Sequence, residues 1–158
     1  MAGTRHKEHL VSTIAWSDKL SVGIDLIDKQ HKSIIEKTAH LEDAIRTGQG
    51  PAEIVRVLDF LVNYMEYHFG TEEKNMRAFD YPELPEHLEK HAQFNATLVN
   101  LSDDFREEGA TQGLADAIET LLMNLFVKHI QDTDNKFGVF LRENNLTMTE
   151  DAEPGENA

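Results

Sequence analysis

Residues 52–79 read AEIVRVLDFLVNYMEYHFGTEEKNMRAF, and this stretch indicates the fold of the chain. Apolar side chains recur every three or four positions through it, which is the period of one face of an α-helix. The stretch contains no proline and is long enough for several helical turns. The residues that share this face are Ile54, Leu58, Leu61, Met65, His68 and Glu72.

Three further segments have the same helical period, at 24–47, 84–108 and 112–142. Glycine and proline residues separate them, and the connections are short. Short connections make consecutive helices antiparallel neighbours. The sequence therefore predicts an all-α fold, an up-down-up-down antiparallel four-helix bundle over residues 23–142.

The two ends of the chain differ from this bundle. Residues 1–22 form a mixed N-terminal arm, and we expect Trp16 and Val22 to anchor it as a loop packed across the bundle. Residues 143–158 carry five acidic residues and no basic one. Such a segment buries too little apolar surface to offset its ordering, so we expect a mostly disordered acidic tail.

The composition excludes several functional classes. The 158 residues are enough for one domain. The chain has 29 acidic and 15 basic residues, and its net charge of -14 argues against binding to nucleic acids or membranes. There is no cysteine, so disulfides, thiolate metal sites and cysteine nucleophiles are excluded. We find neither a signal peptide nor an apolar run of the roughly 18–20 residues that span a membrane, and we expect a cytoplasmic protein.

Histidine and carboxylate side chains interrupt the apolar faces of all four predicted helices. A single such histidine is usually a core residue bonded to a neighbour. Five histidines and two carboxylates buried without partners would each cost several kcal/mol, against a total stability of about 5–15 kcal/mol. Metal coordination would satisfy all of them, so the pattern predicts a metal site. The candidate ligands are His31, His68, Glu72, His87, His91, His129 and Asp134.

The number and type of these donors constrain the metal. A zinc site takes four protein ligands, or three and a water, so seven candidates are too many for one ion. Imidazoles with carboxylates suit iron, copper, zinc or nickel, and carboxylates can bridge two ions. Asp134 follows His129 by five residues, about 140° around an ideal helix. The side chain must therefore reach sideways, or the helix must widen locally, as π-bulges do.

Four pieces of the sequence together resemble the signature of the bacterial hemerythrin family, whose domain is also called hemerythrin-like or HHE cation-binding. They are WSDKLSVGIDLIDKQH at 16–31, HFGTEE at 68–73, HLEKH at 87–91 and HIQDTD at 129–134. The resemblance implies an oxo- or hydroxo-bridged pair of iron ions, Fe2+ or Fe3+. One iron would be bound by His87, His91 and His129, the other by His31 and His68, with Glu72 and Asp134 bridging them.

The same resemblance implies a function. This ligand set leaves one coordination position open, on the iron bound by only two histidines, and dioxygen is the ligand that the family places there. We therefore expect reversible dioxygen binding for storage, delivery or transport, without enzymatic turnover. Three alternatives stay open: an oxygen or redox sensing module, a di-iron enzyme acting on O2, peroxide or nitric oxide, and iron or zinc handling. A protein partner for delivery or signalling and the oligomeric state also stay open.

An oxygen pocket should adjoin the open position. Helical geometry places Ile34 one turn after His31 and Leu125 one turn before His129, and Phe69 and Phe94 should pack beside the ligands. The resemblance leads us to expect an apolar residue where Gln131 stands. A polar side chain there would admit water or donate a hydrogen bond, and it is the feature that favours an enzyme.

Overall fold

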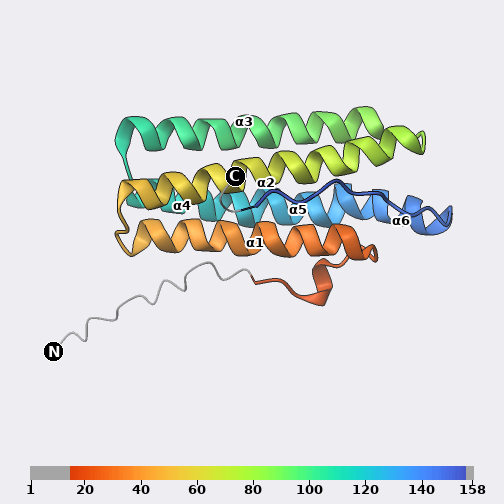
Figure 1. Ribbon diagram of the computed structural model, residues 1–158, viewed down its shortest axis with the longest axis horizontal. Helices are drawn as coiled ribbons and strands as arrows, with labels where there is room; N and C mark the ends of the chain where they lie inside the picture. The colour runs from red at the N-terminus through yellow and green to blue at the C-terminus, as the bar shows by residue number, and fades with distance from the viewer. Residues whose placement is uncertain (1–14, 156–158) are drawn as a thin grey trace.

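Four helical rods make up the fold in Figure 1, a computed structural model that describes residues 15–155. No strand occurs within that range, and the predicted all-α four-helix bundle is confirmed. The first rod packs against the second and fourth, and the third against the same two. The rods are α1 (Asp25–Arg46), α2 (Pro51–Ala78), α3 (Leu84–Glu108) and a composite of α4 (Gln112–Thr120), η2 (Leu121–Phe126), α5 (Val127–His129), η3 (Ile130–Asp134) and α6 (Asn135–Glu143), preceded by the short 3-10 helix η1 (Asp18–Leu20).

Local sequence explains where the helices begin and end. Pro51 occupies the first turn of α2, where its missing N–H costs no helical hydrogen bond. The Thr111 hydroxyl caps α4 by accepting a hydrogen bond from the Leu114 N–H at 3.0 Å. Gly109 ends α3 at a φ of 77°, a conformation that glycine adopts without steric cost. These signals set the short turns that make neighbouring rods antiparallel.

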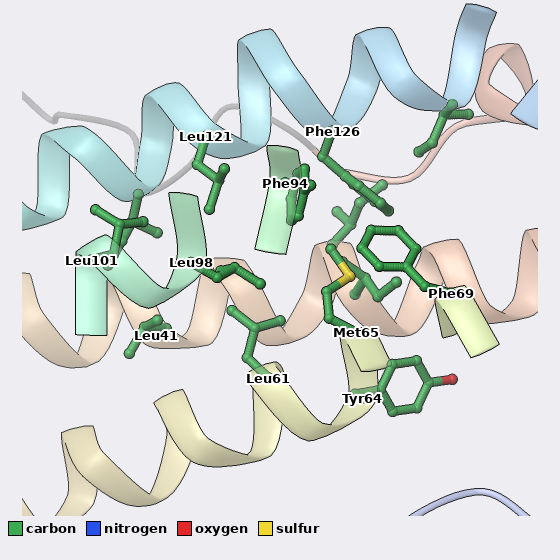
Figure 2. Close-up of a cluster of buried hydrophobic side chains, with 14 of the residues drawn as sticks. Leu41, Leu61, Tyr64, Met65, Phe69, Phe94, Leu98, Leu101, Leu121 and Phe126 are labelled. Carbon is green, nitrogen blue, oxygen red and sulfur yellow. The ribbon is translucent and has the colours of Figure 1, made fainter. Parts of the chain in front are cut away.

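The apolar faces of all four rods meet in one core, part of which Figure 2 shows. Met65 and Phe69 of α2, Phe94 of α3 and Phe126 of the fourth rod converge there, and none of the four is more than 6% exposed. Burial of aromatic and aliphatic surface of this kind is the main stabilising contribution in a small domain. The same core continues past the histidines and carboxylates to Tyr81, Phe137 and Leu141.

Residues 15–22 of the N-terminal arm pack across the bundle, as predicted. Val22 is 2% exposed, and Trp16 lies partly buried against the core. A side chain at Gly138 of α6 would place its Cβ 2.6 Å from the Val22 carbonyl oxygen, so only glycine permits this close approach. Residues 1–14 of the predicted arm lie outside the described range.

The fourth rod contains two π-helical stretches. The one at Ile130–Asp134 is the local widening, one of the two ways in which the sequence allowed Asp134 to reach inward. The second, η2, was not predicted, and it shifts the helical register by one residue. Phe126 consequently faces the core at 1% exposed, whereas Leu125 is 44% exposed. The expectation that Leu125 faces inward is therefore wrong.

The acidic tail differs from expectation between residues 144 and 155. Leu146 and Met148 pack against the core. The Asn75 side-chain amide donates to the Thr149 carbonyl at 2.8 Å, and its oxygen accepts from the Thr149 N–H at 2.9 Å. Tyr64 of α2 donates to Glu153 at 2.7 Å. These contacts hold the segment along α2, because two apolar anchors and a paired backbone offset the ordering that composition alone disfavours; residues 156–158 lie outside the described range.

Candidate metal centre

All seven predicted donors lie together inside the bundle. They come from every rod, and the most exposed of them, His129, is only 6% exposed. Their nitrogen and oxygen atoms form two overlapping groups that share Asp134. The first group is Glu72, His87, His91, His129 and Asp134, and the second is His31, His68 and Asp134.

The Asp134 carboxylate lies between the two sets of histidines. Its Oδ2 is 2.7 Å from Nε2 of His31 and 3.6 Å from Nε2 of His68. Its Oδ1 is 3.0 Å from Nε2 of both His87 and His129. One oxygen therefore faces the two-histidine set and the other faces the three-histidine set, which is the arrangement of a bridging carboxylate. The widened turn at 130–134 makes it reachable.

Glu72 lies between the same two sets from the other side. Its Oε1 is 2.9 Å from Nε2 of His68 and 3.5 Å from Nε2 of His91, and its Oε2 is 3.7 Å from Nε2 of His87. Glu72 follows His68 by one helical turn, so α2 presents both to the interior. The two carboxylates together separate the histidines into a pair and a triplet.

Several of these atoms are close to one another without being hydrogen bonded. Nε2 of His68, His91 and His129 and both carboxylate oxygens of Glu72 are buried with no hydrogen-bond partner. Buried polar atoms normally find one, and leaving them without it is costly. The possible ligand atoms of each group instead lie within 4.8 Å of one another, close enough to surround an ion. Neutral imidazoles with carboxylates are a suitable donor set for iron, so the residues present fit a pair of such ions.

Two neighbouring side chains orient the ligand rings. Nδ1 of His68 is 2.8 Å from Oε1 of Gln30, and Nδ1 of His91 is 3.1 Å from Oε2 of Glu73. Because each acceptor takes an N–H at Nδ1, Nε2 is the ring nitrogen directed into the cluster. Sequence reasoning missed both residues. The available signal was their position, since Gln30 precedes His31 and Glu73 follows Glu72.

The two carboxylates favour positive charge in the cluster, carried either by a proton on a histidine or by a metal ion. Burial opposes the charged form of His68, but Glu72 and Asp134 outweigh it and raise the pKa of His68 to about 9. For Glu72, burial and the charge of Asp134 favour the neutral acid, yet contacts with His68 and His91 lower its pKa to about 2. Contacts with histidines likewise overcome burial and hold the pKa of Asp134 well below its usual range. Both carboxylates are thus ionised at neutral pH.

Aromatic rings pack against histidines of both sets. Phe126 packs edge-on to His31 with ring centres 5.5 Å apart, and Phe69 stacks on His91 at 3.9 Å. Phe94 packs edge-on to both phenylalanines, as Figure 2 shows. Beside them, Ile34 and Phe94 contribute to a cavity of only about 10 Å³.

Two of the expected pocket residues lie elsewhere. Leu125 and Gln131 are both exposed, because the π-helical stretches turn them outward and bring Phe126 and Ile130 inward. The polar position that favoured an enzyme is therefore on the surface. Phe126 was missed because the residue one ideal helical turn before His129 is Leu125.

Comparison with known proteins agrees with this site. The model of the hemerythrin HHE cation-binding domain matches residues 22–141. The chain is 32% identical over 127 residues to a bacteriohemerythrin of Stenotrophomonas maltophilia, covering 80% of each protein, and 30% identical over 142 residues to one of Pseudomonas aeruginosa, covering 90% of each. It is 25% identical over 122 residues to a myohemerythrin of Theromyzon tessulatum, covering 77% of this chain and 88% of that one.

A search of the described helices finds none that is long and apolar enough to cross a membrane. The matched segment contains all seven donors and spans all four rods. The chain belongs to the hemerythrin HHE cation-binding domain family.

Proposed function

We propose that the chain binds dioxygen reversibly at a pair of iron ions, and so stores or delivers it in the cytoplasm. The observation that carries the proposal is the division of five histidines into a triplet and a pair by two carboxylates. His87, His91 and His129 would hold one ion, and His31 and His68 the other. Glu72 and Asp134 would contact both. The relatives named bacteriohemerythrin and myohemerythrin support this assignment.

When bound, the iron pair would supply two electrons and one open coordination position to dioxygen. That position would lie on the side of His31 and His68, which contribute one ligand fewer than the triplet. Both are 0% exposed, and Phe126 covers His31. Ile34, which is 1% exposed, borders the small apolar cavity on this side. These side chains would admit a small apolar molecule and exclude water, which favours release of dioxygen over loss of its reduced forms.

The two residues that orient the rings, Gln30 and Glu73, differ in charge between the two-histidine set and the three-histidine set. Gln30 is a neutral acceptor beside His68, whereas Glu73 is a carboxylate acceptor beside His91. A carboxylate partner makes an imidazole a stronger donor than an amide does. The triplet would therefore hold its ion more firmly, and the pair would hold the ion that exchanges its ligand.

Metal analysis and an oxygenation cycle test the proposal. We expect two iron ions per chain, and a charge-transfer absorption that appears in air after anaerobic reduction and disappears when oxygen is removed. Replacing His31 with Ala should abolish the reversible absorption, whereas His40→Ala should not, because His40 is exposed. One metal ion per chain, or irreversible bleaching on the first exposure to air, would contradict the proposal.

A further inference from the structure

An open groove runs along the outside of the bundle between α3 and the second half of the fourth rod. Its volume is about 570 Å³, and His129 lies in its wall. The groove therefore reaches from solvent to a histidine of the three-histidine set, and Phe94 lines both this groove and the small cavity beside Ile34. The residues that matter to its chemistry are Lys90, Lys128, Lys136, Phe94, Leu125 and His129.

The charge of this groove is opposite to that of the chain. Three of the 15 basic residues line it, in a protein with a net charge of -14. Lys90, Lys128 and Lys136 are all exposed, and none of them has an ion-pair partner between residues 15 and 155. Asp132 is the acidic residue in the lining. Lysines that lack partners on an otherwise acidic surface attract an anion.

The apolar part of the groove is equally unusual. Leu125 is 44% exposed, one of three exposed large apolar side chains among the described residues. Phe94 lies beneath the groove at 6% exposed. Leu125 is exposed because the π-helical stretch η2 turns it outward from the position that an ideal helix would bury. An exposed apolar wall next to convergent polar groups is typical of a ligand site.

We propose that this groove binds a small organic anion with a flat apolar body. The body would lie against Leu125 and Phe94, and a carboxylate, sulfonate or phosphate group would face the lysines. The volume is within the roughly 300–1,000 Å³ of small-molecule sites. Since His129 lies in the wall, an occupant would cover the outer edge of its ring. The proposal does not depend on which metal the cluster holds.

The probe is 8-anilinonaphthalene-1-sulfonate, an anion with a flat aromatic body whose fluorescence rises in apolar surroundings. Titration of the purified full chain at low salt should show saturable binding of about one probe per chain. Added salt should weaken binding, because it screens the lysines. The same aromatic body without the sulfonate, N-phenyl-1-naphthylamine, should bind at least tenfold more weakly. Equal affinity of the two probes would overturn the anionic part of the proposal.

Charge reversal locates the binding site. The double variant Lys128→Glu and Lys136→Glu should weaken binding of the sulfonate at least tenfold. Leu125→Ser should weaken the binding of both probes. Lys19→Glu is the matched control, because Lys19 is exposed at the N-terminal arm, and it should leave affinity within twofold. Circular dichroism should show unchanged helicity in every variant, since the replaced side chains are exposed. Unchanged affinity in the double variant, or an equal loss in Lys19→Glu, would overturn the proposal.

Discussion

Replacing Gln30 with Leu tests whether the residue behind His68 contributes to the metal centre. The side chain is 0% exposed, and its Oε1 accepts a hydrogen bond from Nδ1 of His68 over 2.8 Å. Leucine fills a similar volume but accepts nothing. The Nδ1–H of His68 would then be buried without a partner, and the ring would be free to present either nitrogen to the cluster.

The size of the effect follows from these two losses. Leaving a buried donor unsatisfied costs about 1–3 kcal/mol. For a chain of this size each kcal/mol lowers the melting temperature by about 2–4 °C, so we expect a fall of about 2–12 °C in the metal-free protein. Loss of an orienting partner typically lowers metal affinity about 10- to 100-fold.

Two measurements check the prediction. Thermal unfolding of the metal-free protein gives the stability loss, and competition with a chelator gives the change in iron affinity. Gln131→Leu is the matched control, because it makes the same substitution at an exposed position. It should change the free energy of unfolding by no more than about 0.5 kcal/mol and leave the iron affinity unchanged. Equal effects of the two substitutions would refute the reasoning, and so would a Gln30→Leu protein with unchanged iron affinity.

Three further predictions concern the core, the N-terminal arm and the tail. Phe126→Ala should destabilise the protein by about 3–5 kcal/mol in urea unfolding and accelerate autoxidation, while Leu125→Ala should cost less than about 1 kcal/mol. Gly138→Ala should cost about 1–3 kcal/mol, because its Cβ meets backbone of the arm, whereas Gly70→Ala, with open space around it, should be neutral or stabilising. Burial, then the bond to Glu150, raise the pKa of Tyr67 to about 12, so its contribution to holding the tail is complete below about pH 10 and is lost as the pH rises through 12. The difference in near-ultraviolet absorbance between the protein and a Tyr67→Phe variant should show Tyr67 ionising at that higher pH in the native protein and near pH 10 in urea, and equal midpoints would contradict this assignment.

The helices and the seven donors could be predicted because both follow from helical periodicity. The five-residue spacing from His129 to Asp134 does not fit one face of an ideal helix, so the sequence indicated either a widened helix or a sideways reach, and the structure has the widened helix. The stretch 121–126 could not, because LLMNLF is apolar almost throughout and buries apolar surface in either register. The choice between Leu125 and Phe126 depends on packing against His31 and Phe94, which are distant in sequence.

The tail could not be predicted for a related reason. Its pairing joins Asn75 to Thr149, 74 positions apart, and uses the backbone of residue 149 instead of a recognisable side-chain pattern. Composition describes the average behaviour of such a segment and carries no information about a docking surface elsewhere in the chain. Gln30 and Glu73 were missed similarly, because their role depends on which ring nitrogen they meet.

The docking of the tail has a practical consequence for engineering. Glu153 meets Tyr64 in the middle of α2, so this part of the tail lies alongside the bundle and not at either tip, as the dark blue trace in Figure 1 shows. A fluorescent reporter joined behind residue 155 would start beside that helix. The efficiency of energy transfer from the reporter to a dye on α2 would then fall when the segment detaches. A long spacer between residue 155 and the reporter would make this change smaller.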